Sequence, residues 1–153
     1  MCSSWRVAGA KRVEELLVWQ RTHELNIEVW KLTNNGAATR DFRFREQIRD
    51  AADSSEHTVA EGFGRFNPTE FARFLDISRA SLLEVKGRLR KGLIVGYWEE
   101  DDYKRLDQLA TRAIQALAGF QRYLRSPEAK RNAARRYTRR RDSPHVSDEP
   151  TEL

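Results

Sequence analysis

The sequence predicts an all-α protein, an up-down-up-down four-helix bundle. Apolar residues recur at helical spacing in four segments between residues 13 and 126. No segment alternates polar and apolar residues with period two over a useful length, which argues against a sheet. Short connections separate the segments, and short connections favour antiparallel neighbours. The chain of 153 residues is 39% apolar, which is enough for one core in a single domain.

The first helix is expected over residues 14–34, where Gly36 follows as a stop signal. Its apolar side chains repeat every three or four residues, so they fall on one face of the helix. The residues expected on this inward face are Val18, Leu25, Val29 and Leu32, with Leu17, Trp19 and Trp30 widening it.

The second helix is expected over residues 42–61. Its inward stripe is thin and rich in small residues, which would let a neighbouring backbone approach closely. The members of this stripe are Phe44, Ile48, Ala51, Ala52, Ser55 and Val59.

The third helix has the clearest start. Asn67 can cap it, Pro68 suits the first helical position, and Glu70 completes a capping-box pattern. Gly92 and Gly96 mark its exit. The residues expected to lie inward are Phe71, Phe74, Leu75, Ser78, Leu82, Val85 and Leu89.

The fourth helix begins with four acidic residues, 99–102, which complement the positive end of a helix dipole. Its apolar stripe continues to residue 124, so we place the helix over about residues 99–124. The residues expected to lie inward are Tyr103, Leu106, Leu109, Ala110, Ala113, Leu117, Phe120 and Leu124.

Both ends of the chain are expected to lie outside the bundle, which spans residues 13–126. Residues 1–12 should form a flexible N-terminus. Residues 127–153 contain one aromatic residue, Tyr137, and too little apolar surface to offset the entropy of ordering. We therefore predict a disordered tail there, although its basic part could form a transient helix. The tail is basic and then acidic: residues 127–141 hold seven Lys or Arg and one acid, whereas residues 142–153 hold four acids.

The composition also bounds the setting in which the chain works. No stretch approaches the ~20 apolar residues that a membrane-spanning helix needs, and the first 12 residues lack the apolar run of a secretory signal. Cys2 is the single cysteine, so no internal disulfide is possible. We expect a cytoplasmic protein with no membrane partner.

Four-helix bundles often house metal sites built from Glu-x-x-His pairs. None of the three histidines, His23, His57 and His145, has a glutamate three positions before it. Glu56 and His57 are adjacent on a helix, so their side chains should point about 100° apart, and we expect both to be solvated. The sequence therefore predicts no catalytic residues, no metal site and no cofactor, and a protein that is not an enzyme.

The segment around Glu61, Gly62, Gly64 and Arg65 is the most distinctive local feature. The favoured interpretation is a structural turn in which the glycines relieve positive φ angles and Arg65 pairs with Glu61. The alternative is a ligand loop in which Arg65 meets an anion.

Several motifs carry a resemblance to a known family. The run QIRDAADS at residues 47–54, followed by VAEGFGR at 59–65, resembles the signature of the four-helix-bundle family also called the 23S rRNA intervening-sequence protein family. The run EFARFLDISRASLLE at residues 70–84 resembles its next motif, and Trp19-Gln20 and His23-Glu24-Leu25 resemble its opening helix. Ser55 and Thr58 depart from the family pattern, which usually has Ile and Asn at these places.

The resemblance implies a bundle that assembles as a ring, typically a homopentamer. Its relatives include proteins of obscure role encoded inside ribosomal RNA intervening sequences. They also include the accessory variability protein of diversity-generating retroelements, which associates with a reverse transcriptase and nucleic acid. No motif in this chain encodes either role, so the resemblance alone implies a possible reverse transcriptase partner.

The unevenly spread charge provides the candidate nucleic-acid-binding residues. Arg79, Lys86 and Arg90 should lie on one flank of the third helix, although a solvated helix with mixed charges is the favoured interpretation there. In the tail, a solubilising role and a polyanion-binding role are equally weighted. The basic tail residues are Lys130, Arg131, Arg135, Arg136, Arg139, Arg140 and Arg141, with Tyr137 available to stack on a base.

Two functions are compatible with these observations. The first is an accessory protein that binds RNA or DNA without strong sequence preference. A reverse transcriptase is its possible partner. The second is a structural ring that docks protein partners. In that case the small outward residues Ala80 and Gly87, with exposed Trp5 and Trp98, would make the contacts.

Overall fold

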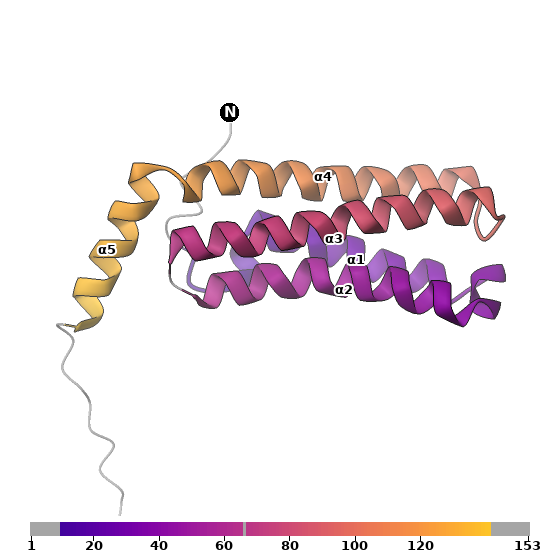
Figure 1. Cartoon of the computed structure of the whole chain (residues 1–153), viewed down its shortest axis with the longest axis horizontal. Helices are drawn as coiled ribbons and strands as arrows, with labels where there is room; N and C mark the ends of the chain where they lie inside the picture. The colour runs from indigo at the N-terminus through magenta and orange to yellow at the C-terminus, as the bar shows by residue number, and fades with distance from the viewer. Residues whose placement is uncertain (1–9, 66, 142–153) are drawn as a thin grey trace, which may run out of the picture.

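The computed structural model describes residues 10–65 and 67–141, and every regular element within them is helical. Within these residues, two short 3-10 helices and five α-helices follow one another (Figure 1). Their bounds are η2 Val13–Glu15, α1 Leu17–Thr33, η3 Ala37–Arg40, α2 Phe42–Gly64, α3 Pro68–Ile94, α4 Glu100–Leu124 and α5 Pro127–Arg141.

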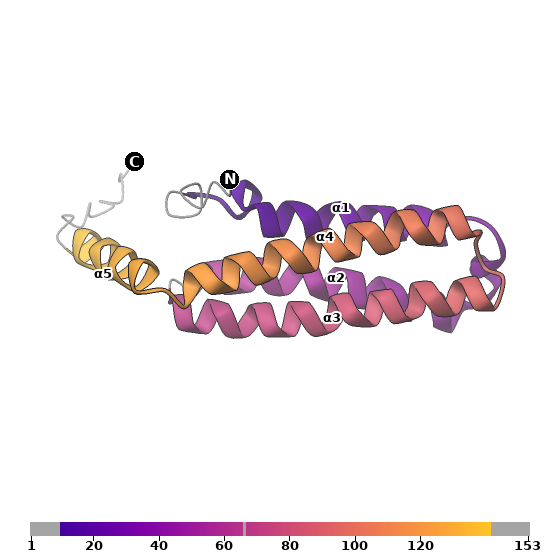
Figure 2. The same cartoon turned by 90° about the horizontal axis from the view of Figure 1, so that it is seen from above.

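Helices α1 to α4 form the predicted bundle. Each packs on the next in the sequence, and α1 also contacts α4, which closes the bundle. Both views show the four helices running side by side along the long axis in alternating directions (Figures 1 and 2). The up-down-up-down prediction is confirmed. None of the described helices is both long and apolar enough to cross a membrane.

The core consists of the stripes that the sequence predicts, with a few differences at their edges. Six leucines are completely buried, and they come from all helices of the bundle except α2, which supplies Ile48 and Val59 instead. Leu17 and Trp30 do not widen the inward face of α1, because 54% and 40% of their surfaces remain exposed. The six leucines are Leu25, Leu75, Leu82, Leu89, Leu106 and Leu117.

The small residues of α2 bring it close to α3. Ser78 of α3 is buried and donates a hydrogen bond of 2.7 Å to the backbone carbonyl of Ser55. The hydroxyl of Ser55 itself donates to the carbonyl of Ala52 at 2.7 Å. The buried polar Ser55 is therefore satisfied, and its small size permits a direct side-chain to backbone contact between two helices.

Side-chain caps fix the starts of α2 and α3. The side chain of Asn67 accepts hydrogen bonds from the backbone N–H groups of Thr69 and Glu70 at 2.9 and 3.3 Å, as predicted. Asp41 caps α2 by accepting from the backbone N–H of Phe44 at 3.0 Å. The hydroxyl of Tyr97 also donates to Asp41, which ties the start of α2 to the connection between α3 and α4. The hydrogen bond from Tyr97, followed by the one from Phe44, lowers the pKa of the Asp41 carboxyl.

The segment from Glu61 to Arg65 at the end of α2 has a structural role, but the predicted positive φ angles at its glycines are absent. Positive φ angles occur only at Gly36 and Gly96 among the described glycines, so Gly62 and Gly64 relieve none. The helix instead continues through Gly62 to Gly64. A Cβ at Gly62 would overlap the ring of Phe71, so close packing against α3 requires glycine there. The predicted pairing of Arg65 with Glu61 is confirmed at 3.0 Å.

The expectation of an exposed Trp98 is wrong. The residue is only 7% exposed, because its indole packs directly over Gly92, where any Cβ would overlap the ring. Its Nε1–H donates to the carbonyl of Leu89 at 3.0 Å, so the buried indole nitrogen is satisfied. Trp98 therefore anchors the connection between α3 and α4. Trp5 lies outside the described residues.

Residues 127–141 differ from the expected disordered tail, because they form helix α5. Local interactions start this helix. The hydroxyl of Ser126 accepts from the backbone N–H of Ala129 at 3.3 Å, and Pro127 occupies the first position. Ala129 is 3% exposed, and Asn132 donates to the hydroxyl of Tyr123 on α4 at 3.3 Å. Alanine and arginine are good helix formers, so little apolar burial is needed. Residues 142–153, predicted to be disordered and acidic, lie outside the described residues.

Candidate nucleic-acid interface

Helix α5 has the highest proportion of basic residues among the described helices. It turns away from the bundle at the end of α4 and extends past it (Figures 1 and 2). Lys130, Arg131 and Arg135 are exposed. Glu128 is the one acid in the helix. The other candidate nucleic-acid-binding residues within α5 are Arg136, Arg139, Arg140 and Arg141.

The three basic candidates on α3 do not form a common surface. Arg79 and Arg90 are exposed, and within the described residues no carboxylate lies within ion-pair distance of either. Lys86 instead faces α4, where its Nζ lies 3.2 Å from Asp107 and donates to the hydroxyl of Thr111 at 2.7 Å. Lys86 thus joins α3 to α4, whereas the phosphate-binding role of Arg79 and Arg90 stays a prediction.

The outer face of α3 holds an apolar surface that sequence reasoning missed. Ala80 and Gly87 are exposed as predicted. Leu83 lies between them in the sequence and is 53% exposed, and Ile94 follows them and is 75% exposed. The separations of 80, 83, 87 and 94 are those of one helix face, which is the signal that could have identified it. Ile77, at 51% exposure, lies beside this outer stripe.

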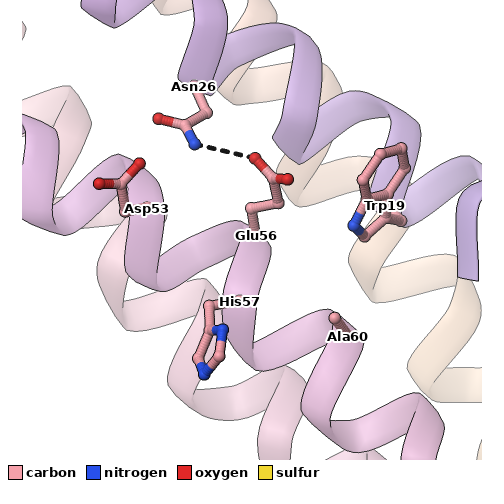
Figure 3. Close-up of a pocket in the computed structure, with 6 residues that line it drawn as sticks. All are labelled: Trp19, Asn26, Asp53, Glu56, His57 and Ala60. Atoms are coloured by element: carbon pink, nitrogen blue, oxygen red, sulfur yellow. Dashed lines mark hydrogen bonds between the residues drawn. The ribbon is translucent and has the colours of Figure 1, made fainter.

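A groove of about 280 Å³ lies between α1 and α2 (Figure 3). Glu56 lines the groove and is only partly exposed, whereas the sequence predicted a solvated side chain. Its two carboxylate oxygens pair with Asn26 Nδ2 at 2.8 Å and with His23 Nδ1 at 3.0 Å. The ring of His23 stacks on Trp19, with the ring centroids 4.5 Å apart.

The groove does not bring Glu56 and His57 together as an acid-base pair. Figure 3 shows Glu56 reaching toward Asn26, whereas His57 extends in the other direction from the same helix. His57 is exposed, as predicted. Because two donors from α1 already occupy Glu56, its role is to hold α1 against α2. Among the described residues, no three His, Cys, Asp or Glu side chains are grouped as a metal site would require.

Arg49 is a buried charged residue that joins α1 and α2 and that sequence reasoning missed. It donates to the hydroxyl of Thr33 at 2.8 Å and to the side-chain oxygen of Asn34 at 2.7 Å. Its guanidinium lies over the ring of Trp30, 4.0 Å from the centroid. Burial is the main cause that lowers the pKa of Arg49. Arg49 thus fastens α2 to the end of α1 and is not available to bind a phosphate.

Comparisons with known proteins agree with the bundle. The family described as 23S rRNA-intervening sequence protein matches residues 14–119. A solved structure with the same fold is a protein of unknown function from the S23 ribosomal protein family of Bacteroides thetaiotaomicron VPI-5482. It is 16% identical to this chain, with a TM-score of 0.63, and the match covers 69% of this chain and 98% of that one. No curated protein matches this chain.

Proposed function

Because the chain belongs to the 23S rRNA-intervening sequence protein family, we propose that it is a non-enzymatic accessory protein that binds nucleic acid through α5. The observation that carries this proposal is the charge of α5. Seven basic residues and one acid give residues 127–141 a net charge of +6, whereas the whole chain has +5. The four-helix body is close to balanced and serves as the scaffold.

The chemistry of α5 favours a polyanion of either kind, RNA or DNA. Lysine and arginine side chains on a projecting helix displace the counterions of a phosphate backbone, which makes affinity depend steeply on salt. Such contacts position a nucleic acid but do not read its bases. The proposed binding is therefore largely independent of sequence.

We further propose that the chain acts as a homo-oligomer, the pentameric ring implied by the family resemblance. The exposed outer stripe of α3, with Leu83 and Ile94 beside the small Ala80 and Gly87, is the surface that supports this proposal. Small residues there would let a second helix approach closely. A ring would also present several copies of α5 to one nucleic acid, which raises the effective affinity.

A reverse transcriptase is the protein partner that the resemblance implies. A basic accessory ring of this kind would hold a nucleic acid near such an enzyme. This partnership rests on the resemblance to the accessory variability protein of diversity-generating retroelements.

Light scattering after size exclusion, with and without a short RNA at two salt concentrations, tests the proposal. We expect a mass near five subunits that takes up RNA at low salt and releases it at high salt. A chain that ignores both RNA and DNA at low salt would overturn nucleic-acid binding. A monomer would overturn the ring.

A structural adaptor that docks proteins is the second candidate function. The exposed Ile77, Leu83 and Ile94 along α3 favour it, because a docked protein would cover these large apolar side chains. A stable oligomer without nucleic-acid affinity would select this candidate over the first.

A further inference from the structure

A basic cavity lies where three helices meet at one end of the molecule. The start of α3, the end of α4 and the start of α5 come together there (Figures 1 and 2). The cavity has a volume of about 360 Å³. Its lining residues are Thr69, Ala72, Arg73, Asp76, Arg125 and Lys130, which we call the corner pocket.

The corner pocket has an excess of positive charge that arises only in the folded chain. Arg73 comes from α3, Arg125 follows α4 and Lys130 lies on α5, so three separate segments each contribute one cation. Asp76 is the one carboxylate in the lining. The formal side-chain charge of the lining is therefore +2, and a ligand with negative charge is favoured.

The carboxylate of Asp76 is already occupied. Its Oδ1 accepts a hydrogen bond of 2.7 Å from the side-chain amide of Gln121, and its Oδ2 lies 3.6 Å from Arg125. Gln121 is only 5% exposed and also donates to the carbonyl of Ala72 at 3.0 Å. A buried amide thus fixes Asp76, which in turn holds Arg125 beside the pocket.

The other two cations remain available. Arg73 and Lys130 have no carboxylate within ion-pair distance in the part of the chain that the structure describes. Both side chains are exposed, so an incoming anion would not have to displace an existing partner. An arginine pair with a lysine is a donor set that suits phosphate oxygens.

We infer that the corner pocket holds a backbone phosphate of the bound nucleic acid and that the strand continues from it along α5. This inference rests on the proposed nucleic-acid binding and deepens it by naming the anchoring point. Lys130 belongs to both the pocket and the helix, and the exposed Arg131 and Arg135 follow it. An isolated phosphate would need the pocket alone, whereas the continuing row of cations suits a polymer.

The test measures the affinity of the full chain for a fluorescently labelled single-stranded RNA by anisotropy. The pocket variant is Arg73→Gln with Arg125→Gln. We expect about tenfold weaker binding, as for the loss of charge-assisted contacts. We also expect a salt dependence shallower by about one unit per lost phosphate contact. The matched control is Arg43→Gln with Arg112→Gln, which removes the same charge from exposed sites on α2 and α4 and should leave the affinity within about twofold of native.

A second variant keeps the inference testable if the first folds poorly. Asp76→Asn removes the one carboxylate of the pocket but retains an oxygen that can accept from Gln121. We expect this variant to bind RNA about threefold more tightly, because less repulsion opposes the phosphate and Arg125 no longer pairs with a carboxylate. A damaged fold would give the opposite result.

Each outcome separates the inference from the proposal beneath it. Native RNA binding that neither pocket variant changes would overturn the corner pocket and leave the function of α5 standing. No RNA binding by the native chain would overturn both. Inorganic phosphate that displaces RNA as effectively as an unlabelled RNA of equal phosphate concentration would mean that the pocket takes isolated phosphate, which also overturns the inference.

Discussion

The four-helix body and helix α5 are both helical, but different physical causes hold them. In the body, completely buried side chains such as Leu25, Leu82 and Leu106 come from facing helices, and polar bridges join neighbours. Helix α5 buries Ala129 and relies on a local cap from Ser126. Burial therefore decides where α1 to α4 lie, whereas propensity and capping form α5 and leave Lys130, Arg131 and Arg135 exposed to solvent.

The largest expected difference between the two regions is in stability, and Leu82→Ala tests the body. The side chain of Leu82 is fully buried, so its loss should lower the free energy of unfolding by about 2–5 kcal/mol. The neighbouring Leu83 is 53% exposed, and Leu83→Ala is the control, with an expected change within about 0.5 kcal/mol for the monomer. Urea unfolding followed by circular dichroism measures both. Equal losses would contradict the assignment of the two faces.

A smaller effect is expected from overpacking the end of the body. In Gly92→Ala the new methyl group would overlap the ring of Trp98, which should cost about 1–3 kcal/mol of unfolding free energy. Gly87 lies on the same helix with open space around its Cα. Gly87→Ala should therefore stabilise the monomer by about 0.5–1 kcal/mol, because alanine suits a helix interior better. Thermal unfolding shows whether the two substitutions differ in sign.

The cap at Asp41 predicts how the body responds to acid. Hydrogen bonds from Tyr97 and Phe44 hold the folded-state pKa of this carboxyl below its ordinary value of 3.8. Its contribution to stability is therefore fully present above that value and is lost as the pH falls through the lower folded-state pKa. Asp41→Asn retains a capping oxygen but cannot titrate, so its stability should fall less below pH 3.8 than that of the native chain. Parallel acid dependences in urea unfolding would contradict this.

The smallest stability effect should come from α5. Replacing Lys130, Arg131 and Arg135 by glutamine removes exposed charges without a buried partner. The free energy of unfolding should change by less than about 0.5 kcal/mol. A loss as large as that of Leu82→Ala would show that α5 is part of the cooperative core, and the comparison between the two regions would fail.

Features that depend on nearby residues could be predicted from the sequence. The cap at Asn67, the leucine stripe of α3 and the small residues of α2 all follow from spacing along one helix. The helix of α5 is partly such a feature, because Ser126 and Pro127 form a recognisable start. The low apolar content of residues 127–141 predicts disorder instead, because it leaves little surface to bury.

Features that depend on residues far apart in the sequence could not be predicted in the same way. Trp98 is buried because Gly92 leaves room for its ring, and Lys86 points to Asp107 on another helix. The pairing of Glu56 with His23 also depends on how α1 packs against α2. The corner pocket unites residues from α3, α4 and α5, so no local motif marks it.

Whether α5 binds the nucleic acid is tested by the salt dependence of RNA affinity. It is measured for the native chain and for a variant in which glutamine replaces all seven basic residues of α5. We expect the native affinity to fall steeply with salt. The variant should bind more weakly and with a shallower salt dependence, but its unfolding transition should be unchanged. A variant that binds with the native affinity and slope would contradict the claim that α5 is the binding element and the four-helix body its scaffold.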